Sequence, residues 1–261
     1  MNRHLPFAPT LLLAAAAALV ACGARSSLRV PPTDAGLGGA GGEGTTAISS
    51  SAASTGGGCQ MFPALPMLVG TVRDFHTAHP DFEKFSADDR GIIETTLGDD
   101  GEPVYAHPDG TTPTTTGKAD FDAWYHDTPG VNESESLTLP LLPVVGGLAL
   151  QSDAFFPIDG ELLGNEGDPH NFHFTYEAHI HFQHTGGEIF RFSGDDDLWA
   201  FIDRRLVIDL GGVHSTETMQ IAIDDLGLTS GETYPLDIYF AERHKDQSTL
   251  HVELLGFDLC Q

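Results

Sequence analysis

The sequence predicts an all-β domain, a β-sandwich or barrel with short helices and long loops, preceded by a disordered tether. From Val69 onward, apolar and polar residues alternate over short stretches that are separated by clusters of Gly, Pro, Asp and Thr. This pattern is typical of strands joined by turns. Apolar stretches with the 3.6-residue period of a helix are scarce, and many short strands without repeated helices favour a sandwich or barrel.

The N-terminal segment, residues 1–21, is expected to be a lipoprotein signal peptide. A basic start at Arg3 and His4 precedes a short apolar run from Leu11 to Val20. Such a run is typical of an export signal and is about half as long as a membrane-spanning helix. It ends in Leu-Val-Ala-Cys at residues 19–22. This ending resembles a bacterial lipobox, which implies that Cys22 is acylated. An ordinary signal peptide that ends near a cysteine is the alternative.

Residues 22–58 begin with Cys22 and continue as a linker rich in Gly, Ala, Ser and Thr. A segment with so few large apolar side chains buries too little surface to offset the entropy lost on ordering. We therefore expect a flexible tether. The estimate for Gly-rich coils gives it a reach of roughly 30–36 Å, which suits a domain held clear of a membrane surface.

The remaining residues, 59–261, are long enough for one all-β domain or two small ones. They carry 36 acidic and nine basic residues, a formal charge of −27. Phosphate binding needs the opposite sign, so this charge argues against nucleic acid as a partner and favours divalent cations and neutral ligands. Cys59 and Cys260 lie at the two ends of the region. Cysteines left over in an exported protein usually pair, so a disulfide is expected, with two free thiols as the alternative.

The clearest alternation runs from Asn171 to Gln183. Every second residue from Phe172 to Phe182 is aromatic or aliphatic, and the intervening positions are polar or charged. A long half-buried strand is predicted. His179 and His181 share its polar face, where a plain outer surface is favoured over a transition-metal site.

Five further stretches show the pattern of strands: Glu188–Ser193, Leu198–Asp203, Leu206–Leu210, Pro235–Glu242 and Thr249–Leu255. The second and third form a predicted hairpin that turns at Asp203 and Arg204. Earlier in the chain, short helices are expected at Pro80–Arg90 and at Lys118–His126. Residues 98–117 are rich in Asp, Pro, Gly and Thr, so they are expected to form a loop.

Seven stretches, in order along about 190 residues, resemble the fibro-slime domain. They are TVRDFHTAHPDFE (71–83), ETTLGDDGEPVYA (94–106), FDAWYHDTPGVN (121–132), FFPIDGELLGNEG (155–167), HNFHFTYEAHIHF (170–182), FSGDDDLWAFIDRRLVIDLGGVH (192–214) and GLTSGETYPLDIYFAERH (227–244). That family occurs in exported and cell-surface proteins. It resembles a branch of the protective-antigen-type (PA-fourteen) β-barrels, which implies that fold for residues 59–261.

A run of three aspartates, residues 195–197, carries the functional part of the resemblance. The wider family has a Ser-Asp-Asp signature followed by an Ile-Asp turn, and Asp195-Asp196 and Ile202-Asp203 keep this spacing. In sugar-binding members the two aspartates are joined by a cis peptide and hold a calcium ion that accepts glycan hydroxyls. The resemblance therefore implies Asp195 and Asp196 as a calcium pair.

Physical chemistry supports a cation at this run. Adjacent carboxylates repel one another, and burial makes their charge costly. Calcium takes six to eight oxygen ligands, and neighbouring carboxylates supply several of them. Asp197 continues the acidic run, and the aromatic ring of Trp199 is a candidate platform for a pyranose. A solvated acidic turn is the alternative.

In the sugar-binding relatives a second loop adds ligands, and it corresponds here to Ala241–Thr249. Three side chains of this loop offer oxygen atoms and two offer hydrogen-bond donors; they are Glu242, Asp246 and Gln247, and Arg243 and His244, respectively. The loop lacks the asparagine of those adhesins. Arg204 stands where relatives carry glycine in the hairpin turn, so a positive φ is expected there.

The function expected from these features is a lipid-anchored, calcium-dependent carbohydrate-binding or adhesion module at the cell surface, with matrix polysaccharide as a candidate partner. Gly23 follows Cys22 where lipoproteins of the inner membrane often have aspartate, so display on the outer membrane is expected. Enzyme activity is not expected, since the sequence has no GxSxG, HExxH or CxxC motif. The alternatives are a structural matrix protein stabilised by calcium and a glycoside hydrolase.

Overall fold

The computed structural model of the protein describes residues 65–260. Four predictions concern residues outside this range: the signal peptide, the acylated Cys22, the linker up to residue 58, and Cys59 as the partner of Cys260. They stay predictions.

Within the described residues, fourteen strands, one α-helix and one 3-10 helix follow one another along the chain. The strands are β1 (Met67–Phe75), β2 (Ala87–Asp88), β3 (Asn132–Pro140), β4 (Leu142–Val144), β5 (Gly147–Ser152), β6 (Phe174–Gln183), β7 (Ile189–Gly194), β8 (Asp197–Ile202), β9 (Arg205–Leu210), β10 (Gly212–Val213), β11 (Glu217–Ala222), β12 (Thr233–Glu242), β13 (Leu250–Leu255) and β14 (Asp258–Cys260). The helices are α1 (Lys118–Phe121) and the 3-10 helix η1 (Ile223–Leu226).

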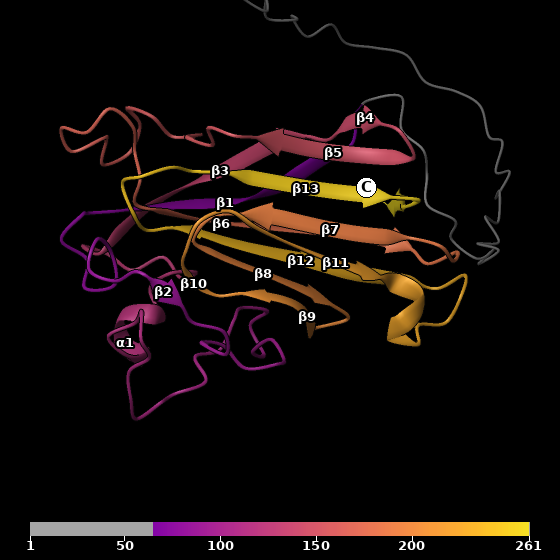
Figure 1. Cartoon of the computed structure of the whole chain (residues 1–261), viewed down its shortest axis with the longest axis horizontal. Helices are drawn as coiled ribbons and strands as arrows, with labels where there is room; N and C mark the ends of the chain where they lie inside the picture. The colour runs from indigo at the N-terminus through magenta and orange to yellow at the C-terminus, as the bar shows by residue number, and fades with distance from the viewer. Residues whose placement is uncertain (1–64, 261) are drawn as a thin grey trace, which may run out of the picture. The chain divides into compact units, whose positions relative to one another are not determined.

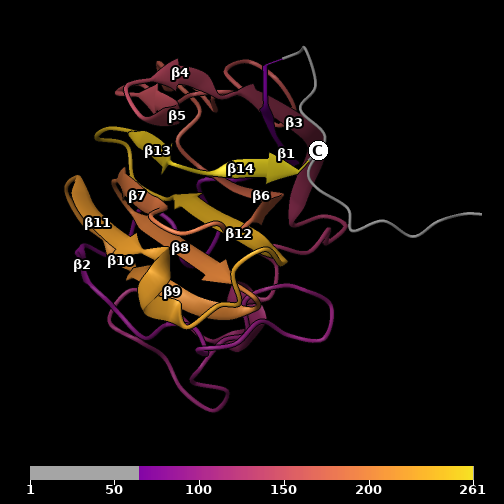
Figure 2. The ribbon, with the colours of Figure 1, turned by 90° about the vertical axis from the view of Figure 1, so that its right-hand side faces the viewer.

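The strands form two large antiparallel sheets. One has seven strands in the order β3-β1-β6-β12-β8-β9, with β14 also paired to β6, and the other has five strands in the order β11-β7-β13-β5-β4. Figures 1 and 2 show the two sheets as separate layers, and β2 and β10 pair as a small third sheet. The predicted all-β sandwich is therefore confirmed.

The main core lies between the two sheets, and the predicted alternation places residues in it. Phe174, Tyr176 and Phe182 of β6 belong to the same buried cluster as Phe190 and Phe192 of β7, on the other sheet. Successive residues of a strand point to opposite faces, so the even-numbered positions of β6 face this core. The prediction for this strand holds on its apolar side.

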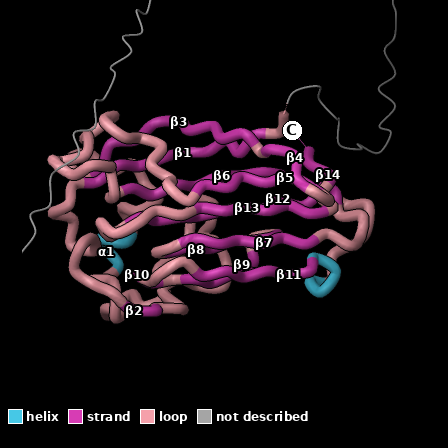
Figure 3. The backbone as a smooth tube through the Cα atoms, turned by 45° about the horizontal axis from the view of Figure 1, so that its top comes forward, coloured by secondary structure: helices cyan, strands magenta, loops and turns pink. Residues whose placement is uncertain are grey.

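The outer face of the seven-stranded sheet carries a second core. Residues 76–131, which we call the cap, connect β1 to β3, and several of their aromatic side chains pack in one buried cluster with Phe75, Trp199, Phe201 and Tyr239 of the sheet. Figure 3 shows most of this segment as loops, with α1 among them at one end of the strands. The cap explains why only His179 and His181 on the polar side of β6 are exposed.

Covering this face buries polar residues that the sequence placed on an outer surface. Thr175 and Glu177 are buried, and Glu177 forms an ion pair with Arg73 at 3.1 Å. The prediction of a strand with a wholly solvated polar face was therefore wrong for the first half of β6. The reason is that the cap supplies a second layer of apolar contacts.

The predicted hairpin is present as β8 and β9. Its two turn residues, Asp203 and Arg204, have φ angles of 51° and 64°, which is the conformation of a type I′ turn between two strands. Arg204 therefore adopts the positive φ that the glycine of relatives would accommodate, and its guanidinium donates to the backbone carbonyls of Leu97 and Gly98.

The two predicted helices differ from the structure. Residues 80–90 contain no helix, because Glu83 has a φ of 60° and Asp81 accepts a hydrogen bond from the distant Thr116 amide at 2.6 Å. The second helix is reduced to the four residues of α1. Such short segments form helices only when tertiary contacts favour them. No helix among the described residues has the length and apolar character to cross a membrane.

Candidate functional site

Asp195 and Asp196 form the whole connection between β7 and β8, where the chain passes from the five-stranded to the seven-stranded sheet. The loop of residues 243–249, between β12 and β13, passes back in the other direction. Both connections lie at the same end of the sandwich because Gly194 pairs with Leu250 and Asp197 pairs with Ala241. The two stretches that the resemblance implied as a site are therefore adjacent.

The first two aspartates hold the backbone of the 243–249 loop. Asp195 Oδ1 accepts a hydrogen bond from the Thr249 amide at 2.6 Å, and Asp196 Oδ2 accepts one from the Arg243 amide at 2.8 Å. Both residues are almost fully buried, with 5% and 4% of their surface exposed. Within the described residues all peptide bonds are trans, so the pair lacks the cis linkage of the sugar-binding relatives; Asp196 has a φ of 52°, a conformation that aspartate tolerates.

Asp197 has a different environment, because it points into the protein. Its Oδ2 accepts a hydrogen bond from Arg243 Nε at 2.6 Å, and its Oδ1 accepts one from the Gly212 amide at 2.7 Å. Both side chains of this ion pair are fully buried. Burial raises the pKa of Asp197 to about 6, although Arg243 acts in the opposite direction. Asp197 therefore has its own counter-ion and does not reach a ligand.

Glu242 adds a third carboxyl group beside the pair. It is fully buried, its Oε1 accepts a 3.3 Å hydrogen bond from the His244 amide, and its Oε2 has no hydrogen-bond partner. Burial, and then the charges of Asp196 and Asp195, raise the pKa of Glu242 well above its usual range. Burial likewise raises the pKa of Asp195, and it raises that of Asp196 to about 7.

This group of carboxyls is costly unless something compensates it. Three acids whose pKa values are raised chiefly by burial must either take up protons or gain a positive charge nearby. The orphaned Oε2 of Glu242 is the kind of buried polar atom that needs an explanation in a native structure. The donor set is all oxygen, which is the chemistry that calcium prefers. The chemistry of these residues therefore suits a calcium ion, although their ligand atoms do not all lie within 4.8 Å of one another in this structure.

A small pocket opens onto the aspartate pair; we call it the aspartate pocket. Its volume is about 180 Å³, and it is lined by Ser86, Asp195, Asp196, Val213, His214, Ser215, His244, Asp246 and Gln247. Three of the loop residues singled out in the sequence, His244, Asp246 and Gln247, line this pocket, and the Asp246 side chain is 91% exposed.

Four of the predicted ligand-binding residues do not line the pocket: Asp197, Trp199, Glu242 and Arg243. Trp199 is fully buried in the second core, where its Nε1 donates to Asp209 Oδ1 at 2.9 Å, so it offers no face to a sugar. Arg243 is also fully buried, and its guanidinium donates to Asp197 and to the carbonyls of Asp81 and Thr114. Both side chains stabilise the domain from within.

Sequence reasoning missed other pocket residues. Ser86 comes from the cap, and no signal in the sequence connects it to the aspartates. His214 and Ser215 follow directly after β10, and the 3.4 Å hydrogen bond from the Asp196 amide to the His214 carbonyl brings them to the site. Residues 192–214 form one motif of the family resemblance, and its last residue, His214, was the signal in the sequence that this part of the chain lies at the pocket.

A second group with metal-ligating atoms lies at the other end of β7. Within the part of the chain that the structure describes, three His or carboxylate ligand atoms lie within 4.8 Å of one another only at His184, Glu188 and Asp224. Glu188 already accepts hydrogen bonds from the amides of Thr185 and Gly186. This arrangement closes a turn without needing a metal ion.

Comparison with known proteins finds one family model that matches part of the chain. Residues 157–256 match the family model of the PA14 domain, which is the protective-antigen-type family expected from the aspartate signature. The match contains both the aspartate pair and the 243–249 loop but not the cap. The all-β fold and this match together support a PA14 domain, whereas membership of the fibro-slime branch stays a prediction.

The same comparisons also find individual proteins and solved structures that are similar to this chain. Over 205 residues the chain is 40% identical to Protein psiD of Dictyostelium discoideum. The alignment covers 71% of this chain and 40% of psiD. The chain spans less than half the length of this relative. Among solved structures, the PA14 domain of the MpAFP antifreeze protein is similar with a TM-score of 0.36 and 10% identity, over 78% of this chain and 93% of that one. The PA14 sugar-binding domain from an RTX adhesin is similar with a TM-score of 0.33 and 12% identity, over 74% and 94% of the chains.

Proposed function

We propose that this protein is a calcium-dependent carbohydrate-binding or adhesion module, without enzyme activity, that a lipid on Cys22 holds at the cell surface. The PA14 match supports a general sugar-binding or adhesion role. One of the similar structures is itself described as a sugar-binding domain from an adhesin. The single observation that carries the proposal is the buried group of Asp195, Asp196 and Glu242, whose carboxylates form no ion pair among the described residues, although the charge of Arg243 partly offsets that of Asp196.

Calcium at the aspartate pair would be held by Asp195 and Asp196, with Glu242 behind them. A bound ion supplies positive charge to this site and accepts hydroxyl oxygens of a sugar in its outer coordination positions. His244, Asp246 and Gln247 line the aspartate pocket, and they would contact sugar hydroxyls as hydrogen-bond donors or acceptors. The 180 Å³ volume of the pocket suits an ion and one edge of a sugar ring, so specificity would come from the rim.

Calorimetric titration of calcium tests the ion site. The test compares the wild-type chain with the double variant Asp195→Asn and Asp196→Asn, which keeps the side-chain shapes and removes both charges. Asp99→Asn with Asp100→Asn is the matched control, because it changes another adjacent pair of aspartates that is exposed. We expect saturable calcium binding by the wild type and the control and none by the first variant. Equal binding by all three proteins would refute the assignment.

Glycan-array binding, with and without a chelator, tests the sugar. A structural matrix protein in which calcium only stiffens the loops is the second candidate, and the burial of Trp199 and Arg243 favours it because neither side chain can contact a glycan. Calcium-dependent binding of any glycan supports the module. Calcium binding that stabilises the domain without glycan binding supports the structural role.

A further inference from the structure

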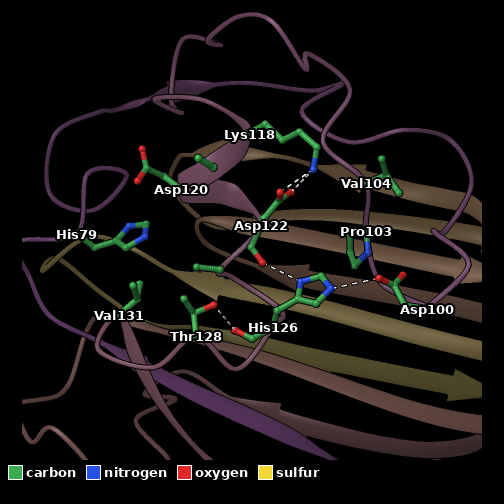
Figure 4. Close-up of a pocket in the computed structure, with 12 residues that line it drawn as sticks. His79, Asp100, Pro103, Val104, Lys118, Asp120, Asp122, His126, Thr128 and Val131 are labelled. Atoms are coloured by element: carbon green, nitrogen blue, oxygen red, sulfur yellow. Dashed lines mark hydrogen bonds and ion pairs between the residues drawn. The ribbon is translucent and has the colours of Figure 1, made fainter.

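A second pocket lies in the cap beside α1, and it shares no lining residue with the aspartate pocket (Figure 4). We call it the α1 pocket. Its volume is about 540 Å³, which falls within the range of sites for small ligands and single side chains. The PA14 match begins at residue 157, so the α1 pocket belongs to a part of the chain outside that match.

The charge of the α1 pocket is negative. Asp100, Asp120 and Asp122 line it against one lysine, Lys118. Lys118 forms an ion pair with Asp122, because its Nζ lies 2.6 Å from both carboxylate oxygens of that residue. Asp100 accepts hydrogen bonds from the Glu102 amide and from His126, and these lower its pKa. The pocket therefore repels anions.

Asp120 is the carboxylate with unused charge. It accepts a 2.8 Å hydrogen bond from the neutral hydroxyl of Thr116, and within the described residues it forms no ion pair. It is only partly exposed and belongs to α1. A positively charged group that enters the pocket would gain a direct partner here, and the strongly acidic domain would attract it from solution.

His79 provides an independent sign of a ligand. Its imidazole lines the α1 pocket, is 6% exposed, and extends from the backbone toward the other lining residues in Figure 4. Its Nδ1 accepts a hydrogen bond from the Asp81 amide at 3.3 Å, which places the proton of the neutral ring on Nε2. That Nε2 is buried and has no partner. A ligand with a carbonyl or hydroxyl oxygen would satisfy this donor.

The remaining walls of the pocket are aliphatic. Pro103, Val104, Ala119, Ala123 and Val131 contribute to the lining, and apart from the imidazoles of His79 and His126 no aromatic ring does. A pyranose ring usually packs on an aromatic face, whereas a methylene chain packs well on small aliphatic side chains. The walls thus favour an extended alkyl chain over a sugar.

We propose that the α1 pocket binds an aliphatic primary ammonium group next to a carbonyl, the chemistry of a lysine side chain within a peptide. The ammonium pairs with Asp120, the methylene chain lies along the aliphatic walls, and the carbonyl oxygen accepts from His79 Nε2. The partner is a lysine-bearing protein surface, and the same ammonium chemistry could come from a free diamine. This site shares no lining residue with the proposed sugar and calcium site.

Calorimetric titration of the full chain tests the proposal, at pH 7 and about 150 mM salt so that long-range attraction is screened. The probe is N-acetyl-lysine N-methylamide, and N-acetyl-norleucine N-methylamide is its neutral match. We expect the lysine probe to bind with a Kd below about 10 mM, and the norleucine probe at least tenfold more weakly. We expect 1,5-diaminopentane, which lacks the carbonyl, to bind more weakly than the lysine probe.

Variants locate the binding. Asp120→Asn should weaken the lysine probe about tenfold, since it removes the unpaired charge and keeps an acceptor for Thr116. Ala119→Lys, at an exposed position of α1, should also weaken it by placing a tethered ammonium at the pocket. Asp225→Asn is the control at an exposed aspartate outside the pocket. All variants should retain the wild-type melting temperature within a few degrees.

Three results would overturn the proposal: no saturable binding of the lysine probe, equal binding of the norleucine probe, or no effect of Asp120→Asn in a folded variant. Equal or tighter binding of 1,5-diaminopentane would overturn the contact to His79 and identify a free amine as the ligand.

Discussion

Replacing Arg243 with methionine is expected to lower the free energy of unfolding by about 3–5 kcal/mol. The guanidinium is fully buried, pairs with Asp197 at 2.6 Å, and donates to the Thr114 carbonyl at 2.7 Å and the Asp81 carbonyl at 3.2 Å. It also lies 4.6 Å above the ring of Trp124. Methionine keeps most of the apolar stem but leaves a buried carboxylate and two carbonyls without their donor.

The magnitude follows from these contacts. Hydrogen bonds to charged groups contribute about 1.5–3 kcal/mol each, but they are not additive within one network. Breaking one partner of a buried ion pair costs about 3–5 kcal/mol, chiefly because the other charge stays buried. In a domain of this size each kcal/mol lowers the melting temperature by about 2–4 °C, so a decrease of about 6–20 °C is expected.

Thermal and urea denaturation of the purified chain measure this effect. Arg205→Met, at an exposed position of β9, is the matched control and should change the stability by less than about 0.5 kcal/mol. The double variant Asp197→Asn with Arg243→Met removes both charges and should recover at least about 1 kcal/mol of the loss. If Arg243→Met were within 1 kcal/mol of the control, Arg243 would not be the link between the sheet and the cap.

Three further predictions concern the backbone, pH and calcium. Gly212 has a φ of 119°, and a Cβ there would lie 2.3 Å from a backbone oxygen of β2. Gly212→Ala should therefore lower the free energy of unfolding, measured by urea denaturation, by about 2 kcal/mol or more. Gly130→Ala, at a φ of 81° with open space around it, should lower it by about 1 kcal/mol, and similar losses in the two variants would contradict the steric argument. Burial and the charge of Glu177 raise the pKa of Glu102 from 4.5 to about 9, so the folded state keeps a proton that the unfolded chain releases, and stability falls as the pH rises from about 4.5 to 9. Glu102→Gln should flatten this decrease in melting temperature between pH 5 and pH 8.5, whereas the exposed Glu135→Gln should follow the wild type. Parallel curves for all three proteins would contradict the retention of a proton by Glu102 in the folded state. Adding a chelator to the calcium-loaded protein should lower its melting temperature by about 5–11 °C at free calcium near 100 times the Kd, and should leave Asp195→Asn with Asp196→Asn unchanged; an equal decrease in both proteins would count against the site.

Six strands of the sandwich, β6 to β9, β12 and β13, could be predicted because their patterns are local, whereas β1, β3, β5 and β11 were not predicted individually. The alternation from residue 172 to 182 placed the apolar side of β6 correctly, and the Asp203-Arg204 turn followed from its position between two short apolar runs. Helices in the cap could not be predicted reliably, since short polar segments take their conformation from distant contacts such as that between Asp81 and Thr116.

The candidate site was predicted in outline but not in orientation. Asp195 and Asp196 do lie beside the 243–249 loop, yet the same run sends Asp197 inward to Arg243. A signal for the burial of Trp199 was present, because five of the six residues of β8, Leu198 to Ile202, form a continuous apolar run, which is typical of a strand covered on both faces. The second cover, the cap, has no local signature.

Arg243 ties two parts of the protein that the sequence keeps more than a hundred residues apart. Its backbone amide is held by Asp196 at the mouth of the aspartate pocket, while its side chain reaches the carbonyls of Asp81 and Thr114 in the cap. Any displacement of the 243–249 loop must therefore either carry those cap residues with it or break their bonds. Ligand binding at the aspartate pocket that displaces this loop would therefore also displace or strain the cap on the outer face of the seven-stranded sheet.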